Sequence, residues 1–348
     1  MVAAKFPFDV VVNDEDWEAD KAQVQAVLLS VADVFIDHFP ENQFPAVKVH
    51  RELDGQPHVK FEPTKDGEIP IWLATGGTAW SQYAYQFGHE LAHIPVNMGG
   101  TTGANDWFSE ALCETASIYV LKSMAKSWAK FAPVDGFPAQ FHDKYSAGLI
   151  NDPKRKLPGG KSLGEWYAEN KDDLRTKPVN ETRDLGNVVA NKIYQLLEAE
   201  PGQWSAVRWV NRGVELADKT LDLYLSEWHY NAPTKHKPFV QKVAKLFEMD
   251  LMNEAELEAA IKKNLKDQAE QVNEQLSELK PEEDEEKQED VSEEESRWMA
   301  RALDLADQAV NQQQNQQSGQ QQGGEQQGSQ QQGSQQQGGE QQGGEQQG

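Results

Sequence analysis

The chain has 348 residues, of which 57 are acidic and 33 basic, giving a formal net charge of −24. Beyond residue 250 there are 22 acidic and 7 basic residues, a net −15, so the acidity belongs mainly to the C-terminal part. Binding to nucleic acid requires clustered Lys and Arg on the docking domain, and we therefore expect no nucleic-acid partner. The single cysteine, Cys113, excludes an intramolecular disulfide and a cysteine-rich zinc module, and we expect it to be a small buried apolar residue.

The first residues do not resemble a secretory signal, because Lys5, Pro7 and Asp9 interrupt the apolar run of residues 1–12. No stretch of the chain approaches the ~20 apolar residues that a membrane helix needs. We therefore expect a cytoplasmic protein with no membrane partner. The oligomeric state stays open at this point.

Composition divides the chain into three parts. Residues 1–250 hold nine of the 10 tryptophans and are expected to form the folded domain. Residues 251–310 form an acidic, partly helical extension, with helical periodicity over 254–279 and 297–310. Residues 311–348 contain 20 glutamines, 10 glycines and no apolar side chain. Such a segment cannot bury enough surface to offset its chain entropy, and it is predicted to be a disordered tail.

The N-terminal part is predicted to combine short strands with one helix. Asn13 or Asp14 is expected to cap the helix, and Asp54-Gly55 is expected to turn a hairpin between the second and third strands. The predicted strands are residues 8–12, 47–51, 58–61 and 69–74, and the helix covers about 17–38.

From residue 80 onward a helical period dominates the pattern of apolar residues. The predicted helices cover residues 80–94, closed by Pro95, and 107–125, 185–198 and 204–210. The predicted fold class is therefore α+β, with a small mixed sheet and a helix over residues 1–95 and a mostly helical part over 96–250.

A chemical motif lies on the first of these helices. His89, Glu90 and His93 match the pattern H-E-x-x-H. Residues i and i+4 project from the same helix face, so both imidazoles can reach one metal ion. Glu90 is placed to take a proton from a water bound to that ion.

Two histidines do not complete a catalytic zinc site, which usually has three protein ligands and an open water position. The next helix offers Glu110 and Glu114, one turn apart on a shared face. On spacing alone, either glutamate could be the third ligand.

The segment Trp107-Phe108-Ser109-Glu110-Ala111, following the H-E-x-x-H helix, resembles the gluzincin metallopeptidases, which include thermolysin-like enzymes. The resemblance covers about residues 69–117. It implies a zincin-like fold, one Zn²⁺ per chain and a peptide or protein substrate. It also implies the roles of four residues: His89, His93 and Glu110 as ligands and Glu90 as general base. Glu114 stands where thermolysin-like members carry an acid that hydrogen-bonds a ligand histidine.

Two further features of that group bear on substrate binding. The strand at 69–74 occupies the position of the gluzincin edge strand, which pairs with substrate, although an ordinary strand with Trp72 in the core is an equal alternative. The G-x-M-E-N block of related aminopeptidases is absent, so exopeptidase specificity is not expected. The oxyanion-stabilising residue stays open among Arg183, Tyr194, His229 and Tyr230, each of which also has an ordinary structural interpretation.

The leading hypothesis is thus a zinc metallopeptidase. The alternative is a catalytically inactive or non-peptidase zincin-like domain that serves as an interaction protein through its acidic and Gln-rich tail.

Overall fold

The computed structural model describes residues 9–14, 16–39, 44–97, 103–216 and 218–278. The chain divides into two compact units, Met1–Gln268 and Ala269–Gly348. The described part of the second unit, residues 269–278, belongs to helix α9 (Glu254–Glu278). The predicted helix at 297–310 and the predicted tail lie outside the described residues.

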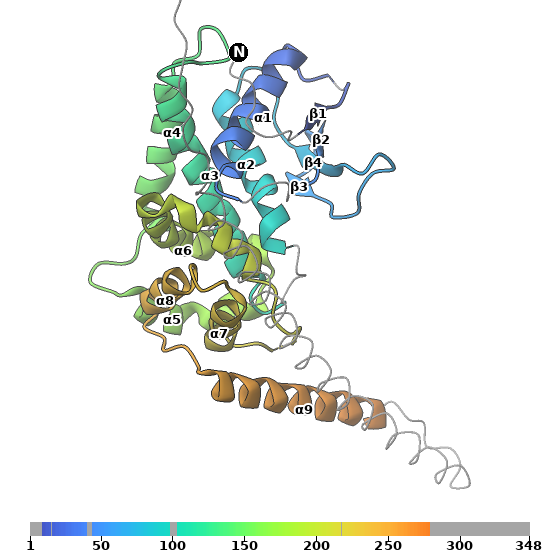
Figure 1. Cartoon of the computed structure of the whole chain (residues 1–348), viewed down its shortest axis with the longest axis vertical. Coiled ribbons are helices and arrows are strands. Elements are labelled where there is room, and N and C mark those ends of the chain that lie inside the picture. The colour runs from blue at the N-terminus through green and yellow to red at the C-terminus, as the bar shows by residue number, and fades with distance from the viewer. Residues whose placement is uncertain (1–8, 15, 40–43, 98–102, 217, 279–348) are drawn as a thin grey trace, which may run out of the picture. The chain divides into compact units, whose positions relative to one another are not determined.

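The N-terminal part contains a mixed sheet of four strands in the order β1-β2-β4-β3. The first three in that order are parallel, and β3 is antiparallel to β4. Helices α1 and α2 lie on the same side of this sheet (Figure 1). The strands are β1 Val10–Val12, β2 Val47–Arg51, β3 His58–Val59 and β4 Ile69–Leu73.

The expected hairpin between the second and third strands is wrong. β2 pairs in parallel with β4, with Val47 opposite Ile69 and Val49 opposite Ile71. This pairing puts fully buried β-branched side chains side by side in the centre of the sheet, while the half-buried β3 takes the edge.

The interpretation of β4 as an edge strand is also wrong, because β3 pairs with it at Ile71 and Trp72. Pro70 has no N–H to donate, but its carbonyl accepts a hydrogen bond from the backbone of Lys60 at 3.1 Å. Trp72 is half-buried and stacks against His50 and His58, with ring centroids 5.0 and 4.7 Å away. It therefore does not belong to the core.

Helix α1 (Lys21–Ile36) begins later than predicted, and the expectation that Asn13 or Asp14 caps it is wrong. Its N-cap is Asp20, whose carboxylate accepts from the backbone N–H groups of Ala22 and Gln23. The sequence places six apolar side chains on one stripe of this helix. Val24, Val27, Leu28, Val31 and Phe35 are buried, and Val34 is partly buried.

The remainder of the unit is mostly helical, which together with the mixed sheet confirms the α+β class. The segment predicted as a helix at 204–210 lies in a 3₁₀ helix, except for its last residue. The elements are α2 Trp80–Asn97, α3 Asp106–Trp128, α4 Gln140–Asn151, α5 Leu163–Thr176, α6 Val179–Ala199, α7 Leu221–Asn231 and α8 Lys237–Leu246, with 3₁₀ helices η1 Pro153–Arg155 and η2 Pro201–Trp209.

Helices α4, α5, α7 and α8 were not predicted. A signal for α5 was present, because Ser162 and Glu165 form a capping box at its start. Helix α2 runs two residues past Pro95, whose missing N–H removes one hydrogen bond in the last turn without ending the helix.

Helices α2 and α3 pack closely and are buried on most sides. Gly88 permits this approach, since a Cβ there would lie 3.3 Å from the side chain of Val120 on α3. The close packing puts the helix that carries His89 directly against the helix that carries Glu110.

The compact unit extends past residue 250, where a domain boundary was expected. Leu257 and Ile261 of α9 are buried in a small apolar cluster with Leu216 and Leu223. Within the described part of the chain, no helix is both long enough and apolar enough to cross a membrane.

Candidate metal centre

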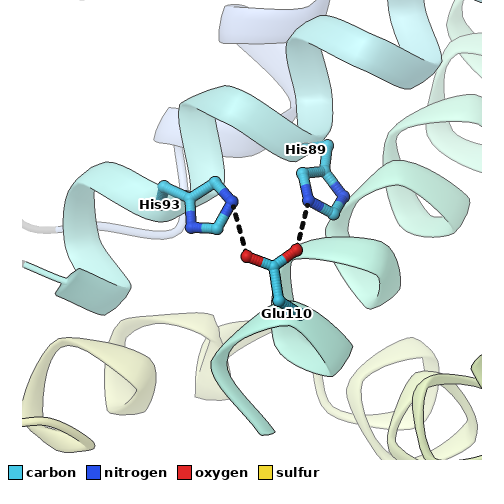
Figure 2. A group of neighbouring side chains, drawn as sticks. All are labelled: His89, His93 and Glu110. Carbon is cyan, nitrogen blue, oxygen red and sulfur yellow. Dashed lines mark hydrogen bonds and ion pairs between the residues drawn. The ribbon is translucent and has the colours of Figure 1, made fainter. Parts of the chain in front are cut away.

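Two imidazoles on α2 face one carboxylate on α3. The Nε2 atom of His89 lies 3.1 Å from one carboxylate oxygen of Glu110, and that of His93 lies 3.4 Å from the other. Figure 2 shows both rings directed at this carboxylate. The three residues each offer a ligand atom, and these atoms lie within 4.8 Å of one another, so the group could hold a metal ion.

The donor set suits zinc, which takes imidazole nitrogen and carboxylate oxygen and often has three protein ligands. The carboxylate of Glu110 is 31% exposed, while the two histidine side chains are 15% and 10% exposed. The group is therefore held by the protein on most sides and stays accessible on the side of Glu110.

A buried amide fixes the backbone on either side of this group. The side-chain N–H of Asn211 donates to the carbonyl of Val96 on α2 at 3.1 Å and to the hydroxyl of Ser109 on α3 at 3.0 Å. The hydroxyl of Tyr224 donates to the oxygen of the same amide at 2.8 Å. Asn211 thus joins the end of α2 to the first turn of α3, next to His93 and Glu110.

The N-cap of α3 is fixed from a distant loop. The side-chain N–H of Asn105 donates to the carbonyl of Lys219 at 2.8 Å. Lys219 is itself held by a fully buried ion pair with Glu227 on α7. These contacts set the start of α3, from which Glu110 projects in the next turn.

The charges of the ligand group are strongly coupled. Burial lowers the pKa of His89, but the hydrogen bond to Glu110 and the charges of nearby glutamates have a larger, opposite effect. Together they raise the pKa of His89 to about 9. Burial raises the pKa of Glu110, but the hydrogen bond from His89 and the charge of His93 bring it down to about 2. Glu110 is therefore ionised at neutral pH, and its negative charge favours a cation beside it.

For Glu90 and His93, burial sets the direction of the pKa shift. Burial raises the pKa of Glu90 to about 7, and it lowers the pKa of His93 to about 4. A carboxyl group with a pKa near 7 can both accept and return a proton at neutral pH. A neutral His93 offers a lone pair for metal binding.

Glu114 lies behind His89, on the side away from Glu110. One of its oxygens lies 3.8 Å from Nδ1 of His89 and accepts a hydrogen bond from the hydroxyl of Tyr85 at 2.7 Å. The other oxygen pairs with the guanidinium of Arg155 at 2.5 Å. Both members of this ion pair are buried, and the backbone carbonyl of Arg155 accepts from Asn191 at 3.0 Å.

Sequence reasoning missed Tyr85 and Arg155. Tyr85 precedes His89 by one helical turn and so shares its face, a spacing from which it could have been found. Arg155 is on η1, far along the chain from Glu114, and no local pattern points to it. Cys113 is fully buried, as expected of a small apolar residue.

Of the four candidates for oxyanion stabilisation, the structure brings Arg183 to the site. Arg183, on α6, lines a pocket together with His89, Glu110 and Glu114. The other three lie elsewhere. Tyr194 lines a different pocket beside Tyr119, His229 lies 3.3 Å from the amide of Gln241, and Tyr230 donates to Glu254.

Comparison of the chain with protein-family models, with curated proteins and with solved structures finds no match. An assignment of function therefore rests on the side chains described above.

Proposed function

We propose that this chain is a zinc-dependent hydrolase that cleaves peptide bonds. The observation that carries the proposal is the convergence of His89, His93 and Glu110 on one point, with the buried Glu90 next to His89 in the chain. A bound zinc ion would supply Lewis acidity and lower the pKa of a water molecule at its open position.

The protein's own residues have separate tasks in this proposal. Glu90 accepts a proton from the attacking water and returns it to the leaving amine, and its buried position directly after His89 in the chain supports this role. Glu114, held by Tyr85 and Arg155, keeps the ring of His89 in one orientation.

Elemental analysis of the purified protein tests the metal, and digestion of an unbiased peptide library tests the reaction. We expect about one zinc per chain, lost on chelation, and cleavage that the Glu90→Gln variant loses while keeping its zinc. Glu215→Gln serves as the matched control, because Glu215 is exposed and outside the site. It should retain both properties.

The possible outcomes separate the two hypotheses. Absence of stoichiometric metal would refute the hydrolase. Metal without turnover on the library would favour an inactive domain whose biological role is an interaction.

A further inference from the structure

The pocket beside the candidate metal ligands has one wall formed by α6. Val179, Thr182, Arg183, Gly186 and Asn187 line it. Their spacing of three and four residues puts them on one face of the helix. The facing wall carries His89 and the two glutamates of α3. A small polar group in this pocket would therefore touch α6 on one side and the candidate metal ligands on the other.

The two walls differ in charge. Glu110 and Glu114 are on the α3 side, where Arg155 is already paired with Glu114. Arg183 is exposed, and within the described residues it forms no salt bridge. It is the basic side chain of the α6 wall, so an anionic group entering the pocket meets attraction on this wall.

The charge of Arg183 lies beside the candidate ligands, because Arg183 lines the same pocket as His89 and Glu110. One turn along α6, the buried Asn187 adds an amide to the same wall. The guanidinium and the amide together offer several N–H donors in the pocket that the candidate metal ligands also line.

We propose that Arg183, assisted by Asn187, binds a carboxylate of the substrate next to the bond that is cleaved. The inference rests on the proposed hydrolase and names its substrate class: peptides with an acidic side chain or a free C-terminus at that position. The planar guanidinium matches a carboxylate through two parallel hydrogen bonds. A phosphate would fit less well, because the single arginine of this wall cannot balance a dianion opposite two glutamates.

This role differs from oxyanion stabilisation. An oxyanion donor acts on every substrate, and its loss lowers kcat for all of them. A carboxylate-binding residue acts only on substrates that carry the carboxylate, and its loss raises KM for those alone.

The test uses zinc-loaded Glu90→Gln protein and a set of short peptides in isothermal titration calorimetry. One pair differs in an internal Glu or Gln, and a second pair differs in a C-terminal carboxylate or amide, which separates the two sources of the carboxylate. We expect one acidic peptide to bind roughly tenfold more tightly than its neutral partner. Adding Arg183→Gln should remove that difference without changing zinc content, and Arg183→Lys should retain part of it.

Arg212→Gln is the matched control, since Arg212 is an exposed arginine outside the pocket, and it should leave the preference intact. Equal binding of acidic and neutral peptides, or a preference that survives Arg183→Gln, would overturn the inference. Turnover of the protein with native Glu90 is measured separately. Cleavage without carboxylate preference overturns this inference and leaves the hydrolase standing, whereas carboxylate-dependent binding without cleavage supports the anion site and counts against the hydrolase.

Discussion

Glu110 and Glu114 are one turn apart on α3 but face different partners. Glu110 lies against Nε2 of both histidines, whereas Glu114 is fixed by Tyr85 and Arg155 and approaches only the far side of the His89 ring. The first arrangement suits a metal ligand, and the second suits a residue that orients one.

Zinc affinity should therefore distinguish the two glutamates. Glu110→Ala removes a ligand, and Glu114→Ala removes an orienting contact whose loss typically costs about 10- to 100-fold in affinity. We expect Glu110→Ala to weaken zinc binding by at least roughly another tenfold. Competition with a chelator at fixed pH measures both, with Glu215→Ala as control. The reverse order would mean that Glu114 is the ligand.

The buried ion pair of Arg155 with Glu114 should contribute to the stability of the fold. Arg155→Met leaves a buried carboxylate without its cation, and we expect the free energy of unfolding to fall by about 3 kcal/mol or more. The double variant Arg155→Met with Glu114→Gln should recover much of that loss, because a neutral amide needs no counter-ion. Chemical denaturation of both variants checks this. Equal destabilisation of the single and double variants would contradict it.

Among the elements, α4 is joined to α2 through a buried histidine. Nδ1 of His142 lies 3.0 Å from the hydroxyl of Ser81, and the ring packs edge-on against Trp128 of α3 with centroids 4.6 Å apart. Burial lowers the pKa of His142 to about 4, so its ring is neutral in the folded protein at neutral pH.

This packing predicts an acid-sensitive stability. The unfolded chain protonates His142 near its ordinary pKa of 6.5, while the folded protein does so only near 4. The stabilisation is thus complete above pH 6.5 and is lost as the pH falls toward 4, at about 1.4 kcal/mol for each pH unit in that window. Between pH 7 and pH 5.5, the free energy of unfolding should fall less for His142→Gln than for the native chain. Chemical denaturation at both pH values measures this difference. Identical losses would exclude this role.

The compact unit includes the first part of α9, up to Gln268. Leu257 and Ile261 cover Leu216 and Leu223, and Asn253 and Glu256 cap the helix through reciprocal hydrogen bonds between side chain and backbone. Removal of α9 would expose these apolar side chains.

Two truncations test this boundary. A chain ending at Gln268 should keep the stability of residues 1–268 and their zinc content, because it retains the buried leucine and isoleucine. A chain ending at Asp250 should lose about 3 kcal/mol or more, since each buried side chain contributes about 1.5–3 kcal/mol. Thermal and chemical denaturation of the two products gives the comparison. Equal stability would put the boundary near residue 250.

Local features of this protein could be predicted from its residues alone. The α1 stripe and the common face of His89 and His93 follow from helical geometry, which backbone hydrogen bonds set within a few residues. The segment with Glu110 could be recognised because it lies on the next helix, within a short stretch of chain.

Features that depend on distant contacts could not be predicted. The pairing of β2 with β4 depends on which strands bury their apolar rows together, and this competition is not visible in either strand alone. The side chains that surround the ligand group also come from distant parts of the chain. Arg155 reaches Glu114, and Arg183 reaches the pocket, only because the helices that follow α3 pack back against it, an arrangement that core packing selects and local periodicity does not encode.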